Sequence, residues 1–209
     1  MLKILLADDH AVVRMGVRQI LAAAFASADF GEVGDLHELL LLVGKQRWDI
    51  VVLDLSMPGG SGLEALKQIK INHPDLPVLI LSTFPADQYG VRTIKAGASG
   101  YLNKESAPEE LVQAVHKALQ GGVYISASVA DELVMHTRRD DDLLPHKRLS
   151  DREYQVLCMI ASGKGVKEIS LEMSLSAKTV STYRTRLMEK MGMGNNAQLT
   201  HYAIENELV

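Results

Sequence analysis

The sequence predicts a five-stranded parallel, doubly wound α/β domain followed by a small all-α domain of four helices. Up to about residue 120, short apolar runs alternate with amphipathic helical patterns, which is the order of elements in a parallel α/β sheet. Beyond residue 148 the helical patterns continue without a strand-like run. A charged, proline-containing segment over residues 138–145 separates the two parts and is typical of an interdomain linker.

The elements of the first domain follow from their apolar spacing. Short runs that favour buried parallel strands cover residues 3–7, 30–34, 50–53, 77–81 and 99–102. Apolar residues at helical spacing predict helices over residues 11–25, 36–46, 62–72, 87–96 and 108–119. The last of these helices has Pro108 in its first turn, with Ser106 as its expected cap.

The second half of the chain is expected to begin with a linker. Gly121 and Gly122 end the α/β pattern, and an amphipathic stretch over residues 126–135 predicts a helix within the linker. We therefore expect domains at 1–122 and 148–209, joined by a linker at 123–147. Helical patterns in the second domain cover residues 151–161, 166–173, 177–191 and 196–205.

The composition excludes several classes of protein. Although 47% of the 209 residues are hydrophobic, no apolar stretch has the roughly 18–20 residues that a membrane span requires. The single cysteine, Cys158, excludes an internal disulfide and is expected in the core. Since the amino terminus also lacks a signal-peptide pattern, we expect a cytoplasmic protein.

Charge differs between the two parts of the chain. Residues 1–146 contain 13 basic and 19 acidic residues, whereas residues 147–209 contain 9 basic and 7 acidic ones. Only the second part is therefore suited to approach a polyanion.

Three carboxylates follow two of the predicted strands. Asp8 and Asp9 come after the first strand and Asp54 after the third, while Lys104 closely follows the fifth. The carboxyl ends of parallel strands meet at one edge of the sheet, so these groups are expected to lie together. Like charges at one site raise one another's pKa unless a divalent cation neutralises them. The sequence thus predicts a Mg²⁺ site beside a fixed cation, which suits a phosphoryl acceptor.

Two other chemistries would use a similar sheet. A nucleotide-binding domain needs a glycine-rich turn after its first strand, but here that turn is Asp8-Asp9-His10, which repels phosphate. A phosphatase or phosphotransferase of the haloacid dehalogenase type needs a second carboxylate two residues after its nucleophile. Here that position is Ser56, which is not a carboxylate, so the sequence does not favour this chemistry.

The motifs of the first domain resemble the receiver domain of bacterial two-component response regulators, a flavodoxin-like fold. The matching residues are Asp8-Asp9, the run DLSMPG at 54–59, Gly62, Ser82 and the run GYLNK at 100–104. The resemblance implies that Asp54 accepts a phosphoryl group from the phosphohistidine of a sensor histidine kinase. It further implies that Asp9, Asp54 and the backbone carbonyl of Ser56 hold Mg²⁺, with Asp8 acting through water.

The same resemblance implies a switch. Ser82 is expected to bond the arriving phosphoryl group while Lys104 neutralises it, and Tyr101 follows the hydroxyl inward. Strand alternation directs the neighbouring Thr83 elsewhere. His10 is expected to begin a helix rather than ligate the metal, because hard carboxylate oxygens already serve the ion.

The helices at 166–173 and 177–191 suggest a helix-turn-helix. Val180, Tyr183, Leu187 and Met191 mark a buried face of the second helix, with Ser176 as its cap. The opposite face is polar and basic, which suits a major groove although it is also compatible with a solvated surface.

Residues 149–209 are similar to LuxR-type DNA-binding domains. The matching residues are LSDRE at 149–153, Val156, Leu157, Gly163, KEI at 167–169, Ser176, KTV at 178–180, Arg186, Leu187, Lys190 and Met191. The resemblance implies that Ser181, Thr182 and Thr185 face base edges. It implies phosphate contacts from Lys178, Thr179, Arg186 and Lys190, and an internal basic partner for Glu153.

A receiver joined to a LuxR-type domain is identified as a member of the NarL/FixJ class of response regulators. The resemblance implies that phosphorylation of Asp54 switches homodimerisation and binding to double-stranded DNA operators with inverted half-sites, without enzymatic turnover. A regulator that binds DNA independently of phosphorylation is the alternative.

Overall fold

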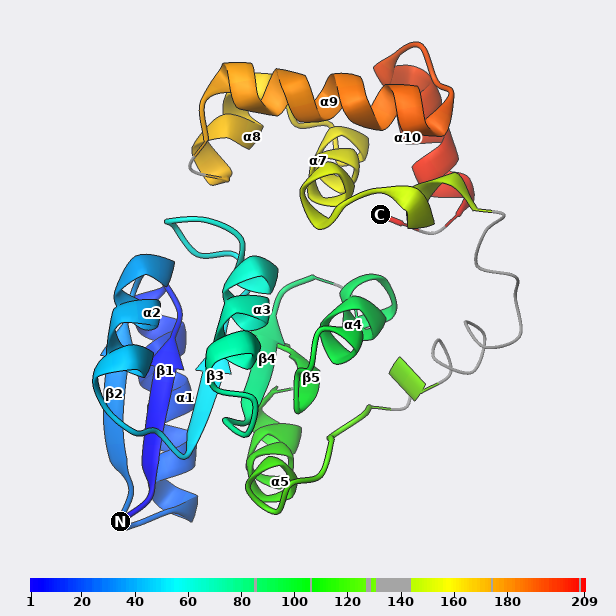
Figure 1. Cartoon of the computed structure of the whole chain (residues 1–209). Coiled ribbons are helices and arrows are strands. Elements are labelled where there is room, and N and C mark those ends of the chain that lie inside the picture. The colour runs from blue at the N-terminus through cyan, green and yellow to red at the C-terminus, as the bar shows by residue number, and fades with distance from the viewer. Residues whose placement is uncertain (85, 106, 127–128, 131–143, 174, 207) are drawn as a thin grey trace. The chain divides into compact units, whose positions relative to one another are not determined.

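The structure is a computed structural model that describes residues 1–209 except 85, 106, 127–128, 131–143, 174 and 207. The chain divides into two compact units, Met1–Met135 and His136–Val209 (Figure 1). Among the described residues, no helix has both the length and the apolar character needed to cross a membrane.

The N-terminal unit is built on a five-stranded parallel sheet. Its strands are β1 (Lys3–Ala7), β2 (Asp29–Val33), β3 (Ile50–Leu53), β4 (Val78–Ser82) and β5 (Gly100–Asn103). They are arranged in the order β2-β1-β3-β4-β5. Since the chain order reverses between β1 and β3, the sheet has its topological switch point there, which is where ligands bind in such folds.

Helices cover both faces of this sheet (Figure 1). They are α1 (Ala11–Ala24), α2 (Leu36–Lys45), α3 (Gly62–Asn72), α4 (Ala86–Lys95) and α5 (Ala107–Leu119). On one face, α1 and α5 pack on a core that includes Leu6, Val52 and Leu81, all nearly fully buried. Strands buried on both sides explain why β1, β3 and β4 are continuous apolar runs rather than alternating ones.

The predicted α/β domain is confirmed, with small differences at the ends of elements. β2 begins and ends one residue earlier than expected, while β4 and β5 lie one residue later. Strand ends depend on ladder hydrogen bonds that an apolar pattern does not specify. The expected cap Ser106 lies outside the described residues, as does most of the helix expected at 126–135.

In the described part of the C-terminal unit, a short 3₁₀ helix is followed by four α-helices. These are η1 (Pro145–Arg148), α7 (Asp151–Ala161), α8 (Val166–Glu172), α9 (Ala177–Met191) and α10 (Asn196–Glu205). The prediction of four helices is confirmed, and α8 ends one residue earlier than expected. Cys158 is buried as expected, and the Ser176 side chain caps α9 by accepting a hydrogen bond from the backbone N–H of Thr179 at 3.0 Å.

One buried carboxylate joins the first and third helices of this unit. Glu153 completes a capping box with Ser150 at the start of α7, and its Oε2 lies 2.6 Å from Nζ of Lys190 on α9. Burial alone would raise the pKa of Glu153, but the hydrogen bonds from Lys190 and Ser150 lower it below its ordinary value. The ion pair is therefore an internal connection between α7 and α9.

The direction of this pKa shift predicts how the C-terminal unit depends on pH. Because the folded-state pKa is lowered, the ionised carboxylate stabilises the unit above the unfolded pKa, and this stabilisation is lost as the pH falls through the lower folded value. Glu153→Gln should therefore cost about 1–3 kcal/mol near neutral pH and progressively less in acid. Hydrogen exchange of the α7 amides in the full chain measures the loss.

Lys164→Met is the matched control. Lys164 pairs with Glu172 at 2.6 Å, but both side chains are more than a third exposed, so its loss should cost below about 1 kcal/mol. A pH-independent effect of Glu153→Gln, or an effect no larger than that of Lys164→Met, would contradict the buried ion pair.

Candidate functional site

The sheet brings Asp8 and Asp54 together. Ala7 and Leu53 are paired in the β1–β3 ladder, so the next residue of each strand emerges at the same edge. The backbone N–H of Asp54 also donates a hydrogen bond to the carbonyl of Ala7 at 2.8 Å. Both carboxylate side chains are almost fully buried, with 7% of the Asp8 side chain and 1% of the Asp54 side chain exposed.

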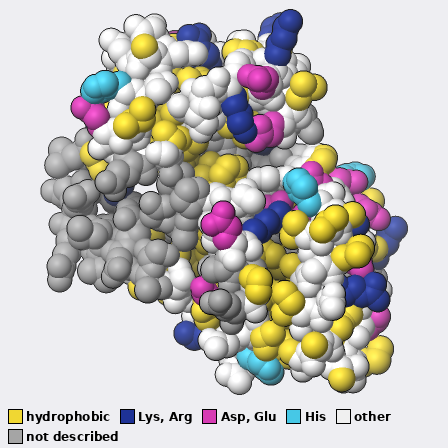
Figure 2. Space-filling view, turned by 180° about the vertical axis from the view of Figure 1, so that it is seen from behind, with side chains coloured by type: hydrophobic (Ala, Val, Ile, Leu, Met, Phe, Trp, Pro, Cys, Tyr) yellow, Lys and Arg dark blue, Asp and Glu magenta, His cyan; other side chains and the backbone are white. Residues whose placement is uncertain are grey.

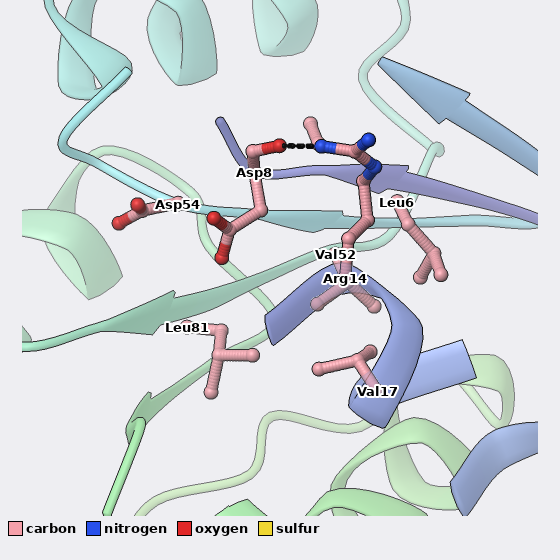
Figure 3. A pocket seen from close by; sticks show the side chains of 8 residues that line it. Leu6, Asp8, Arg14, Val17, Val52, Asp54 and Leu81 are labelled. Atoms are coloured by element: carbon pink, nitrogen blue, oxygen red, sulfur yellow. Dashed lines mark hydrogen bonds between the residues drawn. The ribbon is translucent and has the colours of Figure 1, made fainter. Parts of the chain in front are cut away.

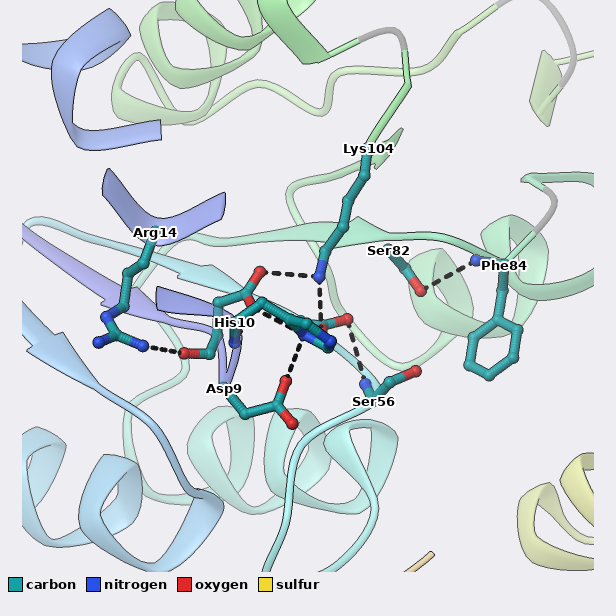
Figure 4. Close-up of polar contacts among 9 residues, drawn as sticks. Asp9, His10, Arg14, Ser56, Ser82, Phe84 and Lys104 are labelled. Carbon is teal, nitrogen blue, oxygen red and sulfur yellow. Dashed lines mark hydrogen bonds and ion pairs between the residues drawn. The ribbon is translucent and has the colours of Figure 1, made fainter. Parts of the chain in front are cut away.

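A lysine that follows a third strand of the sheet reaches both carboxylates. Lys104 follows β5, and its Nζ lies 2.8 Å from Oδ2 of Asp54 and 2.8 Å from Oδ2 of Asp8 (Figure 4). One ammonium group thus bridges two carboxylates, which leaves negative charge that it does not balance. Asp9 is also at this edge and is more exposed.

Burial and the opposite charges nearby shift the pKa values of Asp54 and Lys104. Burial raises the pKa of Asp54 above its ordinary value, although the hydrogen bond and the charge of Lys104 oppose the rise. Burial acts to lower the pKa of Lys104, but the hydrogen bonds and charges of Asp54 and Asp8 outweigh it and raise that pKa. Lys104 therefore stays positively charged at neutral pH.

The carboxylates of Asp8 and Asp54 line a small pocket. Arg14 also lines it, and apolar side chains form the rest of its wall; Figure 3 shows Leu6, Val17, Val52 and Leu81 around the two carboxylates. The pocket has about 200 Å³ of empty space, open solvent included.

The donor set fits a hard divalent cation. One ligand atom from each of Asp8, Asp9, His10 and Asp54 lies within 4.8 Å of the others, and three of these donors are carboxylate oxygens of the kind that Mg²⁺ prefers. The negative charge that Lys104 leaves unbalanced also favours a cation. The residues present therefore suit the predicted Mg²⁺.

Sequence reasoning missed Arg14, which holds the acidic turn in place. Its guanidinium donates a hydrogen bond to the backbone carbonyl of Asp8 from α1 (Figure 4), and it also pairs with Glu32 of β2 at 3.1 Å. The sequence does show an arginine one turn into the helix that follows the acidic pair. The direction of its side chain, however, depends on Glu32 of β2, which no local pattern reveals.

His10 caps the start of α1, as expected of a residue at a helix start, and its ring is turned toward the acidic turn. Its Nδ1 lies 2.7 Å from Oδ1 of Asp9, with 65% of the side chain exposed. Its backbone N–H donates to Oδ1 of Asp8 at 2.8 Å. His10 therefore orients the acidic pair through both its backbone and its side chain.

The predicted switch residues meet at the backbone of Phe84. Ser82, at the end of β4, is fully buried and its Oγ accepts a hydrogen bond from the N–H of Phe84 at 3.2 Å. Tyr101 is also fully buried, and its hydroxyl donates to the carbonyl of Phe84 at 2.7 Å. Phe84 was not predicted, because it contributes backbone atoms that no side-chain pattern reveals. Thr83 is exposed.

The loop after Asp54 is fixed by close backbone contact. The N–H of Ser56 donates to Oδ1 of Asp54 at 3.1 Å. A Cβ at Gly62, the first residue of α3, would lie 2.5 Å from Cα of Leu55. Only glycine permits this approach, which holds the loop that carries Ser56 against the end of β3.

The predicted nucleic-acid face of α9 is accessible. Lys178, Ser181, Thr182, Thr185, Arg186 and Lys190 are exposed, and Thr179 is partly exposed. Val180, Leu187 and Met191 are buried on the opposite side. The hydroxyls of Ser181, Thr182 and Thr185 donate to carbonyls four residues earlier in the helix, so their lone pairs remain directed outward as acceptors. Lys190 differs from the others because it is already paired with Glu153.

The chain matches two protein families along its length. Residues 4–116 match the response regulator receiver domain. Residues 147–203 match the LuxR family of bacterial regulatory proteins.

Characterised relatives match over the whole chain. It is 34% identical to the response regulator UvrY of Escherichia coli K12 over 209 residues, which are all of this chain and 96% of that protein. It is 37% identical to the oxygen regulatory protein NreC of Staphylococcus epidermidis over 216 residues, with 100% and 99% of the two chains covered. A solved structure of RcsB from Salmonella enterica serovar Typhimurium, bound to the promoter rprA with the phosphomimetic BeF₃⁻, matches with a TM-score of 0.66 at 29% identity. That match covers 96% of this chain and 97% of RcsB.

Proposed function

Since the chain belongs to the NarL/FixJ class of response regulators, which join a receiver domain to a LuxR-type DNA-binding domain and regulate transcription, we propose that Asp54 is its phosphoryl acceptor. The observation that carries the proposal is the pair of 2.8 Å contacts from Lys104 to Asp54 and Asp8. They direct a permanent cation at the carboxylate that would be modified.

The transfer requires little covalent help from the protein. An Oδ atom of Asp54 attacks the phosphorus of a phosphohistidine, the P–N bond breaks, and an acyl phosphate forms with one phosphoryl group per chain. Lys104 then neutralises charge on the phosphoryl oxygens. Asp9, Asp54 and the Ser56 carbonyl would hold Mg²⁺, with Asp8 contributing through water, and the ion would supply further neutralisation of the phosphoryl oxygens.

Phosphorylation is proposed to act on the hydrogen bonds around Phe84. The Ser82 hydroxyl accepts from Phe84 N–H in this structure; by donating its own proton to a phosphoryl oxygen, it would be drawn away from that N–H. Tyr101 donates to the carbonyl of the same Phe84, so its hydrogen bond would change when Phe84 shifts. The two residues thus form a switch around one peptide segment.

The exposed side of α1 supports a docking surface for the histidine kinase. Val12 and Met15 of this helix are 81% and 66% exposed, although both are apolar. Figure 2 shows hydrophobic side chains gathered on the N-terminal unit as seen from behind, at lower right in that view. α1 begins directly after the acidic pair, so a partner helix on this surface would stand beside Asp54.

The C-terminal unit is proposed to bind double-stranded DNA through α9. Ser181, Thr182 and Thr185 would face base edges, while Lys178, Thr179 and Arg186 hold phosphates. Lys190 would contribute less as a phosphate contact, because its ammonium group is already paired with Glu153. A domain with little net positive charge gains affinity by homodimerisation on inverted half-sites. Such a regulator of chromosomal DNA would work in the cytoplasm.

One prediction concerns the acceptor. Incubation with acetyl phosphate and Mg²⁺ should add one phosphoryl group per wild-type chain, seen by mass spectrometry of the intact protein. Asp54→Asn, which keeps the size of the side chain, should abolish the gain. A gain that persists in Asp54→Asn would remove the mechanism, and no gain in wild type would favour a regulator that acts without phosphorylation.

Another prediction concerns the DNA-binding face. Lys178→Ala should weaken binding to all sequences alike and lower the salt slope of log K by about 1, because one phosphate contact is lost. Thr182→Ala should instead change the preference among operator sequences. Lys45→Ala removes one positive charge from the end of α2 in the other unit, and it should leave the salt slope unchanged. An equal loss at every site for both α9 variants would contradict the assigned faces.

A further inference from the structure

The chain that leaves α5 does not depart directly from the N-terminal unit. The backbone N–H of Tyr124 donates to the carbonyl of Ser99 at 2.8 Å, and Tyr124 forms a parallel bridge with Gly100 of β5. Its hydroxyl donates to Glu110 of α5 at 2.8 Å. Burial, together with Glu110, raises the pKa of Tyr124 to about 12. Tyr124 thus attaches the start of the linker to the edge of the sheet.

A second contact follows five residues later. Val129 is fully buried, and it packs against Gly90 in the middle of α4. A Cβ at Gly90 would lie 2.6 Å from Cγ2 of Val129 and 3.2 Å from Cγ1. The space that Val129 occupies therefore exists because residue 90 has no side chain.

Glycine plays the same part at both contacts. A Cβ at Gly100 would lie 2.9 Å from the carbonyl oxygen of Tyr124 and 3.0 Å from its Cβ. Gly90 and Gly100 together form what we call the linker face, and Tyr124 and Val129 are the anchors that occupy it. Both anchors belong to the region that the sequence predicts to be an interdomain linker.

The linker face is connected to the acceptor site through one aromatic pair. The ring of Tyr89, the residue before Gly90, stacks on the ring of Phe84 with centroids 4.5 Å apart. Phe84 is also the residue whose backbone bonds both Ser82 and Tyr101. Phe84 is therefore in direct contact with the segment of α4 against which Val129 packs.

We propose that the linker face is a docking site for the chain's own linker, occupied in the structure described here and vacated when Phe84 shifts. The proposal rests on the proposed function for the signal that moves Phe84, but the docking itself does not require phosphorylation. Occupancy holds Tyr124 and Val129 on the receiver, and release frees these two anchors.

The test uses Gly90→Ala in the full chain. Alanine stabilises a helix interior relative to glycine, so α4 should keep its structure while the added methyl group displaces Val129. Amide exchange of Tyr124 and Ala130, whose N–H groups bond Ser99 and Ser126, should accelerate by roughly tenfold or more, as expected when a fully buried valine loses its contact. Nuclear magnetic resonance or mass spectrometry measures this exchange.

Two variants control for steric and helical effects. A Cβ at Gly16, in the middle of α1, meets no atom within 4 Å, so Gly16→Ala should leave exchange at Tyr124 unchanged. Combining Gly90→Ala with Val129→Ala removes the methyl groups that would collide, so the double variant should exchange more slowly at Tyr124 than Gly90→Ala alone. Unchanged exchange in Gly90→Ala would overturn the docking site.

Beryllofluoride with Mg²⁺ tests the connection to the acceptor. It should accelerate exchange at Tyr124 in the wild type and add little in Gly90→Ala, where the face is already vacated. If Gly90→Ala accelerates exchange but beryllofluoride leaves the wild type unchanged, the link to Phe84 is overturned while the docking site stands. Failure of the proposed function itself appears separately, as absence of the mass gain with acetyl phosphate.

Discussion

The ion pair between Lys104 and the two carboxylates of Asp54 and Asp8 is the interaction on which the receiver depends. Burying charge is costly unless it is paired, and here one ammonium group serves two nearly buried acids. The chain can fold with these charged groups buried, but the single positive charge of Lys104 does not neutralise both carboxylates. That imbalance makes the site attractive to a divalent cation and, once the cation is present, to a phosphoryl group.

The order of the strands creates this imbalance. β1 and β3 are neighbours although β2 separates them in sequence, so acids that follow two different strands share one edge. β5 lies two strands away from β3, and the long side chain of Lys104 spans the distance. On the β4 side of the same edge, Phe84 connects Ser82, Tyr101 and Tyr89. A local change at the carboxylates therefore has a physical route to α4.

Much of this could be predicted from sequence, because strands buried on both faces are apolar runs and the residues after them stand at a known edge. Asp8, Asp9, Asp54 and Lys104 were found in that way. The remaining features depend on tertiary contacts that no local pattern encodes. Arg14 of α1 is directed by Glu32 on β2, Phe84 acts through its backbone, and Lys190 of α9 is paired with Glu153 of α7. The packing of Val129 on Gly90 could not be predicted from the sequence either, because a glycine within a helical pattern indicates only a less stable helix.

The most direct test of the central claim is the dependence of stability on Mg²⁺. A ligand that binds the folded state stabilises it by mass action, so the urea midpoint of the N-terminal unit should rise with Mg²⁺ in the wild type. Asp9→Asn should remove most of that rise, whereas Asp29→Asn, an exposed acid on β2, should retain it. An equal Mg²⁺ response in wild type and Asp9→Asn would show that the acidic edge is not the cation site, and the account would fail at its first step.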